Sequence, residues 1–179
     1  LGFARANNLG FAEATGTYIL LLNNDTYSDT QFLRPLVNFM AAKSEMGIAQ
    51  CKLTIPDSGG LLDSAGSFLT HTGFLTHRFY NETNEITTPD EIFCAKGACM
   101  LIKREVIEKV GLFDEDYFAY FEESDFCWRA WLAGYSVYYF PEACIFHIVG
   151  ATSKRLASPF VDFNSFKNRI CALIKNLSI

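Results

Sequence analysis

Apolar residues along the chain form short unbroken runs separated by stretches with helical spacing. The run Tyr18–Leu22 is apolar without alternation and rich in bulky aliphatics, which predicts a strand buried on both faces. Residues 47–55 and 136–140 predict further strands. Residues 92–102 predict two strand segments on either side of Gly97, where the lack of a side chain leaves room for a ligand. We therefore expect an α/β fold.

Between these runs, apolar residues recur at helical spacing. Glycine stands where three of the expected helices end, and Ser28 or Asp29 is the expected N-cap of another. The expected helices lie at residues 1–15, 30–40, 103–110 and 122–133, and the terminating glycines are Gly16, Gly111 and Gly134.

Residues 1–153 are expected to form one domain and residues 154–179 an amphipathic helical tail. The tail can pack on the domain or lie on a membrane surface. Its apolar side chains on one expected face are Phe160, Phe163, Phe166, Ile170, Leu173 and Ile174.

Composition narrows the possible functions. Half of the 179 residues are hydrophobic, enough for a sizeable core. Fifteen basic and twenty acidic residues give a net charge of −5 without a basic run, which argues against a nucleic-acid partner.

No run approaches the roughly 20 apolar residues that cross a bilayer, and no signal peptide opens the sequence. We expect a soluble or peripheral protein, and, because Leu1 begins inside a helix approach, a fragment of a longer one.

Six cysteines are spread along the chain without a C-x-x-C pair. Without a secretory signal, we expect them to be reduced and mostly buried. A zinc site from Cys94, Cys99, Cys144 and His147 is an alternative, although these spacings do not match the usual zinc knuckles.

Asn23, Asn24 and Asp25 follow the first strand directly. Open α/β sheets bind ligands at the carboxyl ends of their strands, and a carboxylate with oxygen-rich neighbours suits a hard divalent cation that shares its positions with a diphosphate. The alternative is that these residues form a turn and a helix cap. Two earlier amides, Asn7 and Asn8, could reach a nucleotide or phosphate, or could be a solvated polar face.

Glu122, Glu123 and Asp125 fall in the first turn of an expected helix, next to several aromatic residues. The helix dipole alone would favour carboxylates there. In an aromatic environment, however, a carboxylate can have a raised pKa and act as a general base. Asp125 is spaced to pair with Arg129. His147 ends an apolar run, where it is either a partly buried structural histidine or a metal ligand.

The order of these signals resembles the family 2 glycosyltransferases, and most closely a bacterial branch that is rhamnosyltransferase-like. The resemblance rests on GFARANNLGFAEATGTYILLLNNDT, the Gly-Ala-Cys segment, FDEDYFAYFEESDFCWR and the strand-end His147, and it extends to about Ser153. It implies a GT-A fold, which is a Rossmann-like mixed sheet with helices on both faces. It also implies that a first strand, helix and strand, which hold the nucleotide base, precede Leu1.

The resemblance also implies residue roles. Asn23-Asn24-Asp25 matches the metal-binding D-x-D motif, with Asp25 its remaining acid, and His147 matches a histidine that helps to ligate the metal in some members. Glu122-Glu123 matches the Glu-Asp pair whose second member is the catalytic base, with Glu123 replacing the usual Asp. The acceptor side is expected to include Gly97, Tyr120, Glu122 and Trp128, and the donor diphosphate to meet Asn7, Asn8, Asn24 and Asp25.

The implied function is inverting transfer of a sugar from a nucleoside-diphosphate donor to a glycan or lipid-linked hydroxyl, with Mn²⁺ or Mg²⁺ as cofactor. The expected location is the cytoplasm, with peripheral contact at the inner face of the membrane. Two alternatives stand beside it. A sugar nucleotidyltransferase would be expected to carry a Gly-rich phosphate loop, which is not visible, and a non-catalytic carbohydrate-binding or scaffold domain would have no need of Asp25 and Glu123.

Overall fold

A central sheet, a small hairpin and five helices make up the part of the chain that is described. The computed structural model describes residues 1–83, 86–149 and 158–177. The sheet contains β1 (Tyr18–Leu22), β2 (Thr26–Tyr27), β3 (Met46–Thr54), β4 (Leu62–Ser64), β7 (Asp90–Glu91), β8 (Cys99–Lys103) and β9 (Ser136–His147), and the hairpin is β5 (Ser67–Leu69) with β6 (Leu75–His77). The helices are α1 (Gly2–Glu13), α2 (Leu33–Ala41), α3 (Arg104–Val110), α4 (Glu122–Leu132) and α5 (Ser158–Asn176), with a 3-10 turn at Glu115–Tyr117.

The sheet is mixed, with the order β1-β8-β3-β9-β2, and β4 and β7 add to β3 and β9. The pair β3 and β9 is parallel. The pairs that β1, β3 and β8 form with one another are antiparallel, as are those that add β2, β4 and β7. The α/β sheet expected from the unbroken apolar runs is therefore present.

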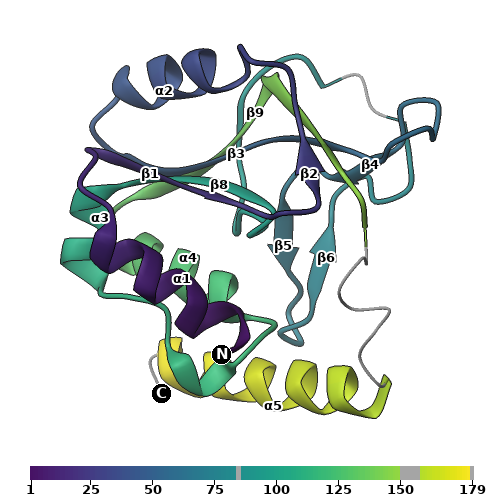
Figure 1. Cartoon of the computed structure of the whole chain (residues 1–179). Helices are drawn as coiled ribbons and strands as arrows, with labels where there is room; N and C mark the ends of the chain where they lie inside the picture. The colour runs from purple at the N-terminus through teal and green to yellow at the C-terminus, as the bar shows by residue number, and fades with distance from the viewer. Residues whose placement is uncertain (84–85, 150–157, 178–179) are drawn as a thin grey trace.

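Helices cover both faces of the sheet (Figure 1). On one face, Leu36 and Met40 of α2 pack in a buried cluster with Ala49, Leu53 and other sheet residues. On the other face, α1, α3 and α4 bury a second cluster that includes Phe11, Val106 and Phe126. Burial on both faces explains why the central strands are apolar without alternation.

Three expected boundaries were wrong. The strand β9 does not stop before Pro141: Phe140 pairs with Cys51 and Cys144 with Lys52, so a bulge absorbs the proline, which has no N–H to donate. Helix α2 begins only at Leu33, and Asp29 instead accepts a hydrogen bond from the Gln31 N–H (2.7 Å) in a turn. Finally, residues 92–94 form a single bridge to β5 and no strand.

Helix α5 packs against the domain through its polar side chains. The buried side chains along it are Asn164, Asn168, Ala172 and Asn176, one turn apart. The apolar side chains are divided: Phe160 and Phe166 lie edge-on against Phe118 and Phe74 of the domain, whereas Phe163 and Ile174 each have 66% of their surface in solvent. The expected amphipathic helix is present, and part of its apolar stripe is exposed.

Candidate active site

Two strand ends bring Asp25 and His147 together. Strand β2 pairs Thr26 with His147, and the Ile148 N–H donates to the Asp25 carbonyl (2.9 Å). These backbone contacts place His147 Nε2 3.4 Å from Asp25 Oδ1. That oxygen is buried and has no hydrogen-bond partner among the described residues. Asn24, next to it, is exposed.

A buried carboxylate lies behind this pair. Asp63, on β4, is fully buried, and its Oδ2 lies 2.8 Å from His147 Nδ1. Its Oδ1 accepts a hydrogen bond from Lys96 Nζ at 2.6 Å. Burial alone would raise the pKa of Asp63, but the hydrogen bond with His147 and the Lys96 ammonium together lower it. Asp63 is therefore an ionised carboxylate that holds one group with each oxygen.

Glu122 and Glu123 begin helix α4. Glu122 is buried and Glu123 is half-buried. Burial raises the pKa of both carboxyls, and the charge of Glu123 raises that of Glu122 further. On Glu123 the increase is opposed by hydrogen bonds from its own N–H and that of Gly97, and by Lys96. We infer that when the pair holds one proton, Glu122 carries it and Glu123 is the ionised member.

The loop before these acids has an unusual backbone. Phe118, Tyr120 and Phe121 all have φ between 59° and 72°, a left-handed conformation that is costly for residues with a side chain. Asn168 of α5 holds it in place, because its Nδ2 donates to the carbonyls of Tyr117 (2.8 Å), Ala119 (2.9 Å) and Tyr120 (2.7 Å). The expected tail thus supports the segment that leads into Glu122.

The structure places the remaining predicted residues as follows. Asn8 is buried and bonds the backbone of Phe113 with both ends of its amide (2.9 and 3.0 Å), so its donor and acceptor are engaged in the fold. Asn7 donates to the Phe3 carbonyl of its own helix (2.9 Å). Gly97 lies against the Phe3 ring, since a Cβ there would meet Phe3 Cζ at 2.7 Å.

Two predicted acceptor-side aromatics are partly accessible. Tyr120 lies in the left-handed loop just before Glu122. Trp128 lies one and a half turns further along α4, where its ring meets Phe93 edge-on at 5.4 Å between centroids. The predicted pair Asp125–Arg129 is confirmed, with 2.9 Å between Asp125 Oδ2 and Arg129 Nε.

A series of contacts runs from Asp25 through His147 and Asp63 to Lys96, and the charge of Lys96 acts on Glu123. Sequence reasoning identified Asp25, His147 and Glu123. It missed Asp63 and Lys96. The available signal was an acidic residue inside the apolar segment at residues 61–69, where an unpaired charge would be costly to bury.

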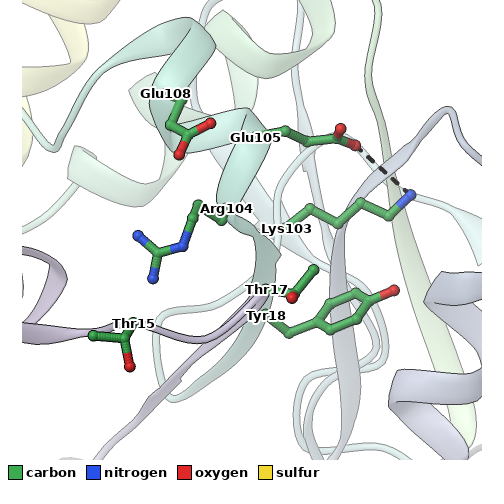
Figure 2. A pocket seen from close by; sticks show the side chains of 7 residues that line it. All are labelled: Thr15, Thr17, Tyr18, Lys103, Arg104, Glu105 and Glu108. Carbon is green, nitrogen blue, oxygen red and sulfur yellow. Dashed lines mark ion pairs between the residues drawn. The ribbon is translucent and has the colours of Figure 1, made fainter.

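A separate hollow lies elsewhere in the protein. It has a volume of about 410 Å³ and is lined by both acidic and basic side chains, among them Lys103, Arg104, Glu105 and Glu108 (Figure 2). Tyr18 also lines it, at the start of β1, whereas Asp25 follows the end of that strand. This hollow therefore lies at the opposite end of β1 from Asp25, and we assign it no role.

The zinc alternative is not supported. All six cysteines are free. Cys94 is hydrogen-bonded with Cys127, and Cys99 with Cys51. Cys94 and Cys99, two of the four residues considered as zinc ligands, therefore have different neighbours. Within residues 1–83, 86–149 and 158–177, no three His, Cys, Asp or Glu side chains are grouped to hold a metal ion.

Comparison with known proteins identifies the family. Residues 18–168 match the family described as glycosyl transferase family group 2. The chain belongs to this family. It is 34% identical over 120 residues to the O-antigen biosynthesis protein RfbC of Myxococcus xanthus, and 31% identical over 78 residues to the low-salt glycan biosynthesis hexosyltransferase Agl10 of Haloferax volcanii. These matches cover 62% and 44% of this chain, and 9% and 25% of the two relatives.

Solved glycosyltransferases share the fold. The structure resembles GalNAc-T7 with UDP, GalNAc and Mn²⁺, with a TM-score of 0.74 and 17% identity over 96% of this chain and 35% of that one. It also resembles the mannosyltransferase PcManGT from Pyrobaculum calidifontis in complex with GDP-Man and Mn²⁺, with a TM-score of 0.56 and 15% identity over 99% of this chain and 56% of that one. Both are GT-A proteins, so the expected fold class is confirmed.

The part of the chain that is described contains no helix that is long and apolar enough to cross a membrane.

Proposed function

We propose that this chain is a catalytic segment of an inverting glycosyltransferase that moves a sugar from a nucleoside-diphosphate donor to a hydroxyl of a cell-envelope glycan or lipid-linked acceptor. The observation that carries the proposal is the position of Glu123. Its carboxylate is half-buried beside Glu122, which holds the proton of the pair. The Glu123 carboxylate accepts a hydrogen bond from the Gly97 N–H and is stabilised by the positive charge of Lys96. A carboxylate whose pKa is raised in this way is more basic than a free one and suits a general base.

Glu123 is the proposed base. The acceptor oxygen forms a bond to the anomeric carbon while the bond from that carbon to the diphosphate oxygen breaks, and the hydroxyl proton passes to a Glu123 oxygen. A single displacement from the face opposite the leaving group inverts the anomeric carbon. Glu122 stays protonated through this step, so the pair carries one negative charge, on Glu123, before the transfer and none after Glu123 takes the proton. Tyr120 and Trp128 would line the acceptor side, whereas Gly97 is buried against the Phe3 ring and would act through its N–H to Glu123.

Asp25 and His147 are the proposed metal ligands on the donor side, with Asn24 beside them. Their atoms fit a divalent cation because Asp25 Oδ1 is buried without a partner and faces His147 Nε2. Mn²⁺ or Mg²⁺ bound there, with the donor diphosphate as further ligand, would neutralise negative charge on the leaving group. Asn7 is a further donor-side candidate, whereas the contacts of Asn8 give it a structural role.

The donor site can be tested by calorimetric titration of the chain with UDP, dTDP and GDP, each with Mn²⁺ and with EDTA. We expect one nucleotide to bind with Mn²⁺, and to lose binding with EDTA or in Asp25→Ala. Asp29→Ala, which changes an exposed acid just after β2, is the control and should bind like wild type. Absence of binding by all three nucleotides would contradict the donor site.

The base is tested by release of the nucleoside diphosphate from the donor that titration selects. We expect Glu123→Gln to lower turnover by about 10² to 10⁴-fold while donor affinity is kept. A Glu123→Gln variant that binds donor and retains full turnover would refute the assignment. If donor binds and turnover is absent in wild type as well, the remaining alternative is a non-catalytic carbohydrate-binding domain.

We further propose a peripheral membrane contact through α5. The helix carries three basic residues against one acidic residue, whereas the whole chain has a net charge of −5. Phe163, Ile170 and Ile174 form an exposed apolar stripe along it. A basic helix with an exposed apolar stripe suits a surface that contains anionic lipids, which would place the enzyme at the cytoplasmic face of the membrane.

A further inference from the structure

Asp63 has an unusual position in this site. It has no surface exposure, and the cost of burying a carboxylate must be offset by its partners. Those partners are His147 on one side (2.8 Å) and Lys96 on the other (2.6 Å). His147 is a proposed metal ligand, and Lys96 lowers the pKa of the proposed base, Glu123. Asp63 therefore does not contact the sugar donor or the sugar acceptor itself. It contacts His147 on the donor side and Lys96, which acts on the proposed base.

The contact with His147 selects a tautomer. Asp63 Oδ2 accepts a hydrogen bond from Nδ1–H, which leaves the lone pair of Nε2 directed toward Asp25 Oδ1, 3.4 Å away. An imidazole that binds a metal needs this lone pair, and a carboxylate behind the other ring nitrogen commonly fixes its orientation.

The contact with Lys96 fixes a charge. Lys96 is largely buried, with 21% of its side chain exposed, and Asp63 is the carboxylate within ion-pair distance. The backbone N–H of Lys96 donates to Gln50 Oε1 (2.7 Å), and Gln50 Nε2 donates to the carbonyl of Ser64, next to Asp63 (3.1 Å). One buried amide thus holds both members of the ion pair in register.

From these contacts we propose that Asp63 is a positioning residue that acts on both halves of the active site: it orients His147 for the metal and holds Lys96 beside Glu123. The proposal rests on the proposed function for the identity of the metal ligands and base. It adds a residue outside the recognised motifs. It also predicts that the two halves of the site fail together when this single carboxylate is removed.

The first test needs no metal and no substrate. The chain has three histidines, so the ¹⁵N spectrum of histidine-labelled protein is simple to assign with His71→Gln and His77→Gln. We expect His147 in wild type to carry its proton on Nδ1 in a strong hydrogen bond, and this signature to be lost in Asp63→Asn. A wild-type His147 protonated only on Nε2, or an unchanged spectrum in Asp63→Asn, would overturn the proposal. The wild-type spectrum decides the matter even if Asp63→Asn does not fold.

The second test measures Mn²⁺ affinity by calorimetry with saturating UDP. We expect the Kd for Mn²⁺ to rise about 10 to 100-fold in Asp63→Asn, the usual effect of removing a carboxylate behind a histidine ligand. Lys96→Met should leave this Kd unchanged, because Lys96 does not touch His147. Asp57→Asn, which removes an acid from the exposed turn before β4, is the matched control. Equal Kd values in Asp63→Asn and Asp57→Asn would contradict the proposed role.

The third test concerns Glu123. The groups that face it are Glu122 beside it, with Tyr120 next to Glu122, Lys96 and the Gly97 N–H from the loop before β8, and the Cys94 thiol. Without the ammonium in place, the ionised form of Glu123 loses support. We expect the acid limb of turnover to move to higher pH in both Lys96→Met and Asp63→Asn, and to stay in Asp57→Asn. An acid limb that moves only in Lys96→Met would contradict the proposal that Asp63 holds Lys96 beside Glu123.

These tests separate the role of Asp63 from the proposed function. If wild type does not bind Mn²⁺ and UDP, the glycosyltransferase site assignment fails, while the His147 spectrum still reports whether Asp63 orients the imidazole. If wild type binds both and Asp63→Asn is unchanged, the function stands and the positioning role is wrong.

Discussion

Glu122 and Glu123 connect catalysis to stability at the scale of single residues. Burial raises both pKa values in the folded protein, and the charge of Glu123 raises that of Glu122 further. The folded state therefore holds more protons than the unfolded state at pH values between the ordinary carboxyl pKa and the raised ones. In that window the unfolding free energy falls as pH increases. Below it, where both states are protonated, the pair carries no penalty.

The fall of the unfolding free energy with increasing pH gives a prediction for Glu122→Gln. A glutamine keeps the shape of the protonated acid and cannot ionise, so the variant should lose the fall in stability across the window. Each proton involved contributes a slope of about 1.4 kcal/mol per pH unit. Denaturant unfolding from pH 4 to pH 9 measures it, with Glu108→Gln on α3 as an exposed control. A wild-type and a Glu122→Gln curve that stay parallel would contradict the raised pKa.

Single residues also show what could be predicted from sequence. Asp25 and His147 were identifiable because each follows an apolar strand, and strand ends are where such sheets bind ligands. Asp63 could be noticed as an acid inside an apolar segment, but its role could not be predicted, since it depends on partners 33 and 84 residues away in the sequence that are brought near only by the fold.

At the scale of elements, helix α5 and the loop before α4 depend on each other. Three residues of that loop have left-handed backbones, and Asn168 donates to three of its carbonyls. We predict that Asn168→Leu destabilises the protein by about 2–4 kcal/mol, because buried carbonyls lose their donor. It should also lower turnover more than Mn²⁺ or UDP affinity, since the loop positions Glu122 and Glu123 and not Asp25.

Asn164 provides the matched control for this prediction. It is buried on the same face of α5, but its amide donates to Phe160 of its own helix (2.9 Å). Asn164→Leu should therefore cost less stability and leave turnover near wild type. Thermal unfolding and donor turnover of the two variants, measured side by side, decide the matter. Equal effects would show that any buried leucine on α5 disturbs the protein in this way.

The elements that were predicted well are those whose apolar pattern has one interpretation. The strands β1 and β3, and the helices α3 and α4 with their terminating glycines, lie within a residue or two of expectation. The orientation of α5 could not be found this way. Its apolar stripe allowed packing on the domain or contact with a membrane, and the asparagines face the domain because the strained loop offers carbonyls that only donors can satisfy.

At the scale of the whole molecule, this orientation leaves an apolar surface uncovered. Phe163, Phe166 and Ile174 are each more than half exposed along one helix, and the basic side chains Lys167, Arg169 and Lys175 lie on the same helix. Apolar side chains that insert into a membrane gain about 1.5–3 kcal/mol each when fully buried, and nearby cations gain from anionic lipid. The same helix thus supports the active site on its polar face and can meet a membrane on the other.

The last prediction follows from that two-sided helix. The chain should sediment with vesicles that contain anionic lipid, and it should do so less at high salt. Phe163→Ser combined with Ile174→Ser should lower the partition coefficient at least tenfold. A tenfold change corresponds to about 1.4 kcal/mol, and two inserted apolar side chains contribute more than that. Leu132→Ser on α4, where 65% of the side chain is exposed, is the control and should bind like wild type. Because Phe163 and Ile174 point away from the domain, the double variant should keep its unfolding temperature and its donor turnover. Vesicle binding that survives the double change, or that falls equally in Leu132→Ser, would rule out α5 as the membrane contact.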